Sequence, residues 1–295
     1  MENLGSCPIC NSNKAYTKLT CVDDTVSKER FEIKECQSCG FNYTDPRPKP
    51  ENLGRYYESV DYVSHSDTNK GLINFLYQLV KKHTLRKKVN LINTLSKRGS
   101  ILDIGSGTGD FLNACKTDGW KTMGVEPSKI ARDLSIKKHK LVIKEESEIG
   151  TIEEKSFEII SLWHVLEHVP DLNNRIKEIE KLLKKDGTLI IAVPNRTSYD
   201  AKVYIQNWAG YDVPRHLYHF SPSDIKKLFE NYGFEIVKIK PMLFDAYYVS
   251  LLSEKIKTGK TNFIKGMLNG LISNLLAIKN KNTCSSQIYI LRKTA

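Results

Sequence analysis

The pattern of apolar and polar positions divides the chain into three stretches. Residues 5 to 45 carry cysteines and few long apolar runs, and the proline-rich segment 45–50 follows them. Between about residues 70 and 98, apolar residues recur at helical spacing among lysines and arginines, which predicts one or two amphipathic helices. Beyond residue 98, short apolar runs alternate with amphipathic segments. This alternation indicates strands that are separated by single helices.

The alternating region predicts a parallel sheet with helices on both faces, because a crossover through a helix brings the next strand back in the same direction. Expected strands are 101–104, 121–125, 141–144, 157–163, 188–193, 234–240 and 287–291, and expected helices are 110–118, 128–138, 172–184 and 222–231. Two stretches interrupt the alternation, an aromatic and histidine-rich one at 195–220 and a lysine-rich helical one at 241–283. We therefore expect a module at 1–45, a linker at 46–69, and an α/β domain at 70–295 with these two insertions.

Composition adds two expectations. No apolar run approaches the length of about 20 residues that a transmembrane helix needs, and the first residues lack a basic region followed by an apolar core. We therefore expect no transmembrane segment, no signal peptide, and a cytoplasmic protein with reduced thiols. The formal net charge of +11 is typical of proteins with phosphate-bearing partners, including nucleic acid, but it is equally typical of a surface that only maintains solubility.

A glycine-rich turn follows the first strand of the alternating region. Residues 103–109 read Asp-Ile-Gly-Ser-Gly-Thr-Gly and run into a predicted helix, so free N–H groups at the helix start can face a ligand. The dinucleotide fingerprint is Gly-x-Gly-x-x-Gly, whereas this turn has a different spacing and an acid two residues before its first glycine. Asp103 suits a cationic amino group, and Glu126, after the next strand, can accept both ribose hydroxyls. This combination favours S-adenosylmethionine over NAD, although the glycines alone fit a plain tight turn.

The turn and three further segments together resemble the class I S-adenosylmethionine-dependent methyltransferases, in the small-molecule branch related to ubiquinone-pathway enzymes. The matching segments are 102–109, 124–128, 156–160 and 166–169, and the resemblance covers about residues 98–240 and the last strand. It implies a Rossmann-like α/β sheet. It also assigns eight residues to the cofactor, which are Asp103, Gly105, Ser106, Gly107, Gly109, Glu126, Trp163 and His164. Residues 144–148 depart from the family pattern, so no adenine-binding residue is assigned.

The segment His164-Val-Leu-Glu167-His168 also matches the H-x-x-E-H signature of inverted zinc peptidases. That site needs both histidines inside a stable helix, whereas here the motif follows directly on an apolar strand and Pro170 comes two residues later. We therefore exclude a peptidase. His168 is instead a candidate catalytic base, or a packed histidine that supports the cofactor loop.

Residues 208–220 hold the densest group of functional side chains in the chain. Free histidine side chains change charge near neutral pH, so His216 or His219 could remove a proton from a hydroxyl, an amine or an activated carbon during methyl transfer. Arg215 could hold a phosphate or a carboxylate of the acceptor. The alternative is a loop that is packed by its aromatic residues, with both histidines bonded to backbone.

Two cysteine pairs, Cys7-x-x-Cys10 and Cys36-x-x-Cys39, have the spacing of two zinc knuckles. Four thiolates would fill all positions of a tetrahedral ion, so we expect a structural zinc in a small zinc ribbon. A redox-active pair is the alternative. A four-cysteine module in front of this type of methyltransferase is similar to that of the sugar C-methyltransferases.

Three functions follow from these patterns. The first is a methyltransferase acting on a small molecule, such as a nucleotide-linked sugar or a surface-polysaccharide precursor. The second is an RNA methyltransferase that uses the zinc module and the basic helix at 70–98, which the positive charge favours. Against it, residues 163–166 read Trp-His-Val-Leu, whereas enzymes that methylate base amines carry Asp/Asn-Pro-Pro-Tyr/Phe there. The third is a scaffold that binds S-adenosylmethionine without turnover.

Overall fold

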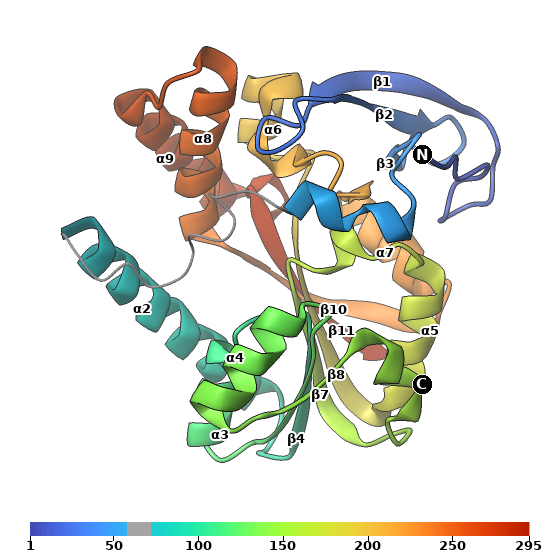
Figure 1. The fold of residues 1–295 in the computed structure, drawn as a ribbon, viewed down its shortest axis with the longest axis vertical. Coiled ribbons are helices and arrows are strands. Elements are labelled where there is room, and N and C mark those ends of the chain that lie inside the picture. The colour runs from blue at the N-terminus through green and yellow to red at the C-terminus, as the bar shows by residue number, and fades with distance from the viewer. Residues whose placement is uncertain (58–71, 295) are drawn as a thin grey trace.

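The computed structural model describes residues 1–57 and 72–294, and the side chains of residues 72–79 lie outside this description (Figure 1). A seven-stranded sheet has the order β10-β11-β8-β7-β4-β5-β6. Its strands are β4 (Ser100–Ile104), β5 (Lys121–Val125), β6 (Val142–Lys144), β7 (Phe157–Trp163), β8 (Leu183–Pro194), β10 (Phe234–Pro241) and β11 (Ser286–Lys293). The helices are α2 (Leu72–Leu95), α3 (Asp110–Thr117), α4 (Lys129–His139), α5 (Leu172–Leu182), α6 (Tyr199–Tyr204), α7 (Pro222–Glu230), α8 (Leu243–Thr258) and α9 (Phe263–Lys279).

One strand of this sheet runs opposite to the direction that the sequence predicts for an all-parallel sheet. The pairs among β4, β5, β6, β7 and β8 are parallel, whereas β11 runs antiparallel to both β8 and β10. The connection from β10 to β11 consists of two helices, α8 and α9, which return the chain to the edge of the sheet that it left. A strand that starts from that edge must run in the opposite direction.

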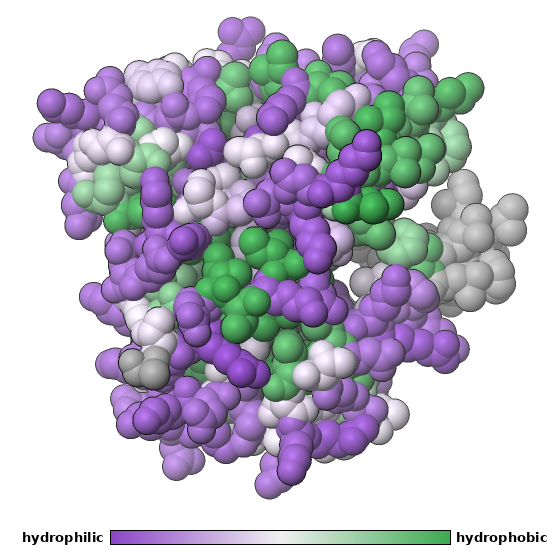
Figure 2. Space-filling model, turned by 180° about the vertical axis from the view of Figure 1, so that it is seen from behind, coloured by the Kyte–Doolittle hydropathy of each residue, from purple (hydrophilic) through white to green (hydrophobic). Residues whose placement is uncertain are grey.

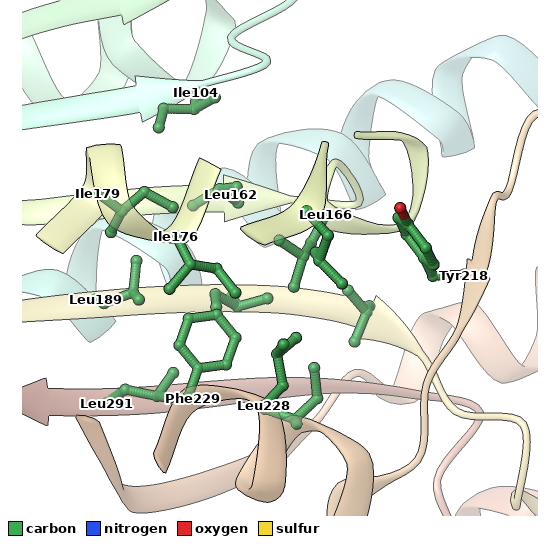
Figure 3. Packing of buried hydrophobic residues seen from close by; sticks show 14 of the residues in the cluster. Ile104, Leu162, Leu166, Ile176, Ile179, Leu189, Tyr218, Leu228, Phe229 and Leu291 are labelled. Atoms are coloured by element: carbon green, nitrogen blue, oxygen red, sulfur yellow. The ribbon is translucent and has the colours of Figure 1, made fainter. Parts of the chain in front are cut away.

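Alternation of side chains along the strands gives the sheet two apolar faces, as predicted. Ile101, Ile159 and Ile190 face the helices α2 and α3 in one cluster. Their chain neighbours Leu102, Ile160 and Leu189 belong to the other cluster, which contains α5 and α7. Figure 3 shows part of this second cluster, in which Ile176 and Ile179 of α5 and Leu228 and Phe229 of α7 pack against β7, β8 and β11. The Rossmann-like sheet with helices on both faces is therefore confirmed.

A smaller antiparallel sheet contains the N-terminal residues. Its strands are β1 (Ala15–Val22), β2 (Arg30–Cys36), β3 (Asn42–Thr44) and β9 (Tyr218–His219), in this order. The fourth strand comes from the first insertion, about 170 residues after β3. The pairs Asn42↔His219 and Tyr43↔Tyr218 join it to β3. The cysteine module and the insertion at 195–220 therefore share one sheet, a feature that local sequence patterns did not predict.

Residues that follow the cysteine module also contact the main domain. The Arg47 guanidinium donates to the carbonyl of Pro170, just beyond β7, and to the Tyr218 hydroxyl. Two short 3-10 helices, Pro50–Asn52 and Gly54–Tyr57, lie in the stretch 46–69 that we expected to be a linker, and residues 58–69 of that stretch lie outside the described residues. No helix in the described part of the chain is long and apolar enough to span a membrane.

A buried arginine holds these parts together. Arg215 is 1% exposed and forms two hydrogen bonds to Asp212, through Nε at 3.0 Å and Nη2 at 2.6 Å. Its Nη2 also lies 3.0 Å from Asp23 Oδ1, and its Nη1 donates to the carbonyl of Tyr56 at 2.8 Å. Burial opposes the charge of the guanidinium, but Asp212 and Asp23 more than offset that cost and raise its pKa. Its burial and its partners within the chain indicate a structural role for Arg215, and the ligand-binding role stays a sequence-based prediction.

We predict that Arg215→Met lowers the free energy of unfolding by about 3–5 kcal/mol, because it leaves the buried carboxylate of Asp23 without its cation. Urea denaturation followed by circular dichroism measures this change. Lys129→Ala removes an exposed ion pair with Asp133 and serves as the control, for which we expect at most about 1 kcal/mol. Equal losses for the two variants would contradict the role given to Arg215.

Candidate functional site

The glycine turn lies at the carboxyl end of β4 and opens a surface for a ligand. Gly105, Gly107 and Gly109 have φ values of +72°, +55° and +79°, which favour glycine. A Cβ on Gly105 would lie 2.3 Å from a methyl group of Val165, whereas nothing lies within 4 Å of a Cβ placed on Gly107. The inner side of the turn is therefore closed by packing, and its middle is open for close approach of a ligand to the backbone.

Glu126 connects this turn to the end of β5. Its Oε2 accepts from the Gly107 N–H at 2.7 Å, and its Oε1 accepts from the Ser128 N–H at 2.9 Å. A carboxylate offers about four acceptor positions, so each oxygen keeps a lone pair for a hydroxyl. The carboxylate is thus fixed in place beside the open part of the turn, where the sequence predicts ribose binding.

Asp103 is buried at the end of β4, where its Oδ1 accepts from the Ser161 hydroxyl at 2.6 Å. Burial raises the pKa of this carboxyl to about 7, although Ser161 and the cation of Lys88 both favour the charged form. The Lys88 ammonium, from α2, lies 4.0 Å from the centre of the Trp163 ring. The turn is thus bordered by an acid that ionises near neutral pH.

Two buried polar atoms beside the turn have no hydrogen-bond partner among the described residues, the Ser106 hydroxyl and the Trp163 indole nitrogen. Buried polar groups are almost always paired in native proteins. A ligand with polar groups in this position would satisfy both atoms. The open glycine, the fixed carboxylate and these two atoms fit a nucleoside with an amino acid side chain such as S-adenosylmethionine.

Beyond β7, a second group of residues forms a cluster that we call the acceptor cluster: His164, Glu167, His168 and His216. His164 Nε2 lies 3.0 Å from Asp245 Oδ2, and His164 Nδ1 lies 3.4 Å from Glu167 Oε1. Glu167 is 1% exposed, and neither of its carboxylate oxygens has a hydrogen-bond partner among the described residues. A buried carboxylate in this state is costly unless cations or a ligand compensate for it.

Hydrogen bonds to backbone fix the tautomers of two of these histidines. His168 Nδ1 lies 3.0 Å from the carbonyl oxygen of Arg215, and His216 Nδ1 lies 2.9 Å from that of Gly210. A carbonyl oxygen only accepts, so each Nδ1 carries the proton and each Nε2 keeps its lone pair. Both Nε2 atoms can therefore accept a proton or bind a cation.

Electrostatics separates the roles of the histidines. Burial alone would lower the pKa of His164, but the carboxylates of Asp245 and Glu167 raise it to about 10. Burial and the neighbouring His216 lower the pKa of His168 to about 4. At neutral pH, His164 is therefore a cation between two carboxylates, and His168 is a neutral imidazole.

Among the residues that the structure describes, two groups of side chains could hold a metal ion. Ligand atoms of Glu167, His168 and His216 lie within 4.8 Å of one another, and so do the four sulfur atoms of Cys7, Cys10, Cys36 and Cys39. Sγ atoms are 3.6 Å apart between Cys7 and Cys39, and 3.5 Å apart between Cys10 and Cys36. A tetrahedron with zinc–sulfur bonds of about 2.3 Å has edges of about 3.8 Å, whereas a disulfide bond measures about 2.05 Å. The four thiols thus fit a tetrahedral zinc ion better than two disulfides.

The structure does not bring His219 to the acceptor cluster. This residue lies in β9, is 3% exposed, and its Nε2 lies 3.0 Å from the Thr44 hydroxyl. Thr44 donates its proton to the carbonyl of His216, so it accepts from His219. Burial, with the charges of His216 and Arg196, lowers the pKa of His219 well below its usual value. A catalytic role for His219 stays a sequence-based prediction, and its position indicates a packing role.

Comparison with known proteins agrees with this geometry. A family profile described as "Methyltransferase domain" matches residues 77–239, which is more than half of the chain. The chain belongs to this family. The match includes the glycine turn, Glu126 and the acceptor cluster, and it confirms the prediction of an S-adenosylmethionine-dependent methyltransferase; the cysteine module lies outside it.

Individual relatives of this methyltransferase are distant. The ubiquinone biosynthesis O-methyltransferase of Rickettsia canadensis is 24% identical over 210 residues, which cover 64% of this chain and 86% of that protein. The enzyme of the same name from Pelagibacter ubique is 29% identical over 177 residues, which cover 54% of this chain and 74% of that protein.

Among solved structures, a SAM-dependent methyltransferase from Archaeoglobus fulgidus has a TM-score of 0.50 at 19% identity. The match covers 75% of this chain and 99% of that one. A possible histamine N-methyltransferase from Thermotoga maritima has a TM-score of 0.51 at 20% identity, with 76% and 96% covered. The solved structures share the fold of this methyltransferase.

Sequence patterns missed three residues of this site. Glu167 is part of a recognised motif, but no role was assigned to it. Asp245 lies in the second insertion, 81 residues after its partner His164, and Lys88 is one of many basic residues in α2. The one signal in the sequence for Glu167 was an acid between two histidines of a short motif. Nothing in the local sequence distinguishes Asp245 or Lys88 as residues of the site.

We predict that the affinity for S-adenosylmethionine rises with pH through the pKa of Asp103. The raised pKa means that Asp103 is mostly protonated at pH 6 and mostly ionised at pH 8, and only the ionised form attracts the amino group of the ligand. The fraction ionised changes by about tenfold over this range, and isothermal titration calorimetry measures the affinity. Asp103→Asn should bind weakly at both pH values, and Asp133→Asn, at an exposed position, should behave as wild type. A wild-type affinity that stays constant from pH 6 to 8 would exclude this role.

We also predict one zinc ion per chain, held by the four cysteines. Atomic absorption of purified protein should give one equivalent, and Cys36→Ser should lose it because three thiolates remain. Cys21→Ser is the matched control, since Cys21 is a buried cysteine outside the cluster. Full zinc content in Cys36→Ser would refute the site.

Proposed function

We propose that this methyltransferase transfers a methyl group to a hydroxyl of a small molecule bound at the acceptor cluster, and that its substrates are nucleotide-linked sugars or surface-polysaccharide precursors. The observation that carries the proposal is the buried carboxylate of Glu167, which has no hydrogen-bond partner among the described residues and lies near two histidines that each keep an Nε2 lone pair. The His164 cation offsets part of its charge, and the hydrogen-bonding capacity that remains suits proton transfer better than packing.

On this proposal the cofactor occupies the space along the glycine turn. Asp103 holds its amino group, Gly105, Ser106, Gly107 and Gly109 contact its methionine part, and Glu126 holds the ribose hydroxyls. Trp163 and His164, at the end of β7, lie on the side of the transferred methyl. The cofactor supplies an electrophilic methyl group on a positively charged sulfur atom.

The residues of the acceptor cluster handle the proton of the acceptor. The lone pair on His216 Nε2 would accept the hydroxyl proton while the acceptor oxygen bonds to the methyl carbon and the carbon–sulfur bond of the cofactor breaks, with its electron pair going to sulfur. Glu167 stabilises the imidazolium that forms, and the carbonyl of Gly210 keeps the ring in the tautomer that accepts at Nε2. His164, already a cation, stays oriented by Asp245 and compensates for part of the charge of Glu167.

The substrate class is inferred from charge, from relatives and from the position of the cysteine module. The net charge of +11 favours a phosphate-bearing molecule, and the relatives named above are called O-methyltransferases. The cysteine module contacts the acceptor cluster, since Thr44 donates to the carbonyl of His216. Tyr57, which follows the module, adds a second contact, because its hydroxyl lies 3.1 Å from His168 Nδ1. A structural zinc and a cytoplasmic location belong to the same proposal.

A screen with labelled S-adenosylmethionine separates this proposal from the RNA hypothesis. Nucleotide-linked sugars, phenolic hydroxyl compounds and bulk RNA are offered in parallel. Label in a sugar nucleotide supports the proposal, label in a phenol supports the reaction but refutes the substrate class, and label in RNA alone refutes both.

For catalysis, we predict that His216→Ala lowers kcat by about 10²–10⁴-fold, because the variant lacks the proton acceptor. The dissociation constant of S-adenosylmethionine should stay within about twofold, since His216 does not line the glycine turn. His219→Ala is the comparison, and we expect it to lower thermal stability more than kcat. Wild-type turnover by a folded His216→Ala protein would exclude His216 as the base.

A further inference from the structure

The outer face of α9 carries an apolar stripe in contact with solvent. Five residues at successive spacings of four and three form this stripe, and each is between 44% and 82% exposed. They are Ile264, Leu268, Leu271, Leu275 and Ile278. Such spacing keeps all five on one side of a helix. A helix of 17 residues is about 25 Å long, so the stripe runs along most of it.

The opposite face of α9 is fixed to the protein. A Cβ on Gly266 would lie 3.0 Å from the Cα of Leu251, and one on Gly270 would lie 2.8 Å from the Cα of Tyr247, so the two helices of the hairpin pack closely. Asn269 donates to the Tyr204 hydroxyl of α6 at 2.8 Å. The stripe therefore cannot turn inward, and it stays exposed as long as α9 keeps these contacts.

The stripe continues onto α8 and toward the acceptor cluster. Leu243, Phe244 and Tyr248 of α8 are between 41% and 57% exposed. Phe244 adjoins Asp245, the partner of His164. Figure 2 shows an apolar area at the upper right, on the side where α8 and α9 lie in this reversed view. We call the exposed apolar residues of α8 and α9 the hairpin face.

Charge determines which partner the hairpin face fits. Six exposed lysines lie on the hairpin and beside it, Lys255, Lys257, Lys260, Lys265, Lys279 and Lys281. Residues 255–295 contain no aspartate or glutamate. A second copy of the chain would therefore bring lysines against lysines, because neither acid of the hairpin is available to them: Asp245 pairs with His164 and Glu254 is buried. A partner that is both apolar and anionic fits the surface.

We propose that the hairpin face binds an anionic phospholipid surface, with α9 lying in the plane of the interface. Apolar residues of the stripe would enter the boundary between headgroups and acyl chains, and the lysines would contact lipid phosphates. Both contributions are general features of interfacial helices. Because Phe244 and Asp245 are neighbours, the membrane would lie next to the acceptor cluster and could present an amphiphilic acceptor to it. The binding itself does not depend on the proposed function.

Flotation of the full chain with lipid vesicles tests this proposal, in the absence of cofactor and acceptor so that the outcome is independent of catalysis. Vesicles contain phosphatidylcholine alone or equal parts of phosphatidylcholine and phosphatidylglycerol. We expect binding to the anionic vesicles only, and binding should weaken as salt is raised. Ile264→Gln with Leu275→Gln should lower the partition coefficient by at least about tenfold, because two apolar side chains no longer enter the interface.

Matched variants keep the test specific. Ile130→Gln with Leu134→Gln alters two residues of α4 that are 76% and 47% exposed, and it should leave vesicle binding unchanged. Lys260→Glu with Lys279→Glu, at two exposed positions, should weaken binding to anionic vesicles without altering the circular dichroism spectrum. The proposal is overturned if wild type fails to float with anionic vesicles at low salt, or if the α9 and α4 variants lose binding equally. It is also overturned if sedimentation velocity shows a dimer that the α9 variant dissociates while no vesicle binding occurs.

Discussion

The buried guanidinium of Arg215 is the interaction on which the acceptor cluster depends. It bonds to Asp212 of its own loop and to Asp23 and the carbonyl of Tyr56 from the N-terminal part of the chain. Its own carbonyl holds the ring of His168, and the next residue is His216. One cation thus fixes the loop that carries His216, the base that we propose, against the cysteine module, and the position of the cluster follows from this contact. A charge this deeply buried persists only because all of its partners are present.

This dependence gives the cysteine module a physical role. The buried apolar residues of the module belong to clusters that it shares with the rest of the chain, Phe41 and Tyr43 in one and Phe31 and Ile33 in the other. A segment of this size is stable alone only with added constraints such as a metal. Its β3 strand pairs with β9, and Thr44 accepts from His219 and donates to the carbonyl of His216. The conformation of the module is therefore coupled to that of the acceptor cluster through the pairing of β3 with β9 and through the hydrogen bonds of Thr44. The cofactor region, in contrast, is built from β4, β5 and β7 and needs no contact with the module.

The sequence predicted the parts of the site that lie close together along the chain. The glycine turn and Asp103 come from seven consecutive residues, and the four cysteines come in two short pairs, so spacing alone identified them. The main strands and helices between residues 98 and 240 were also found, because each has its own period, whereas α6 and β9 in the first insertion were not predicted. The sequence did not predict three further features, which are the pairing of β9 with β3, the hydrogen bond between His164 and Asp245, and the antiparallel direction of β11. Each depends on residues or segments that become neighbours only after folding. Local pattern identified His219 as a candidate for catalysis, whereas its strand pairing indicates a role in packing.

The central claim is that zinc-dependent order in the cysteine module holds the acceptor cluster but not the cofactor region. Hydrogen exchange of the protein before and after removal of zinc by a chelator tests it directly. The amide of Leu217 donates to the carbonyl of Glu167, and its neighbours lie in β9. We predict that residues 215–219 lose protection when zinc is removed, while residues 101–105 of the cofactor region keep theirs. Unchanged protection at 215–219, in protein that has lost its zinc, would contradict the account.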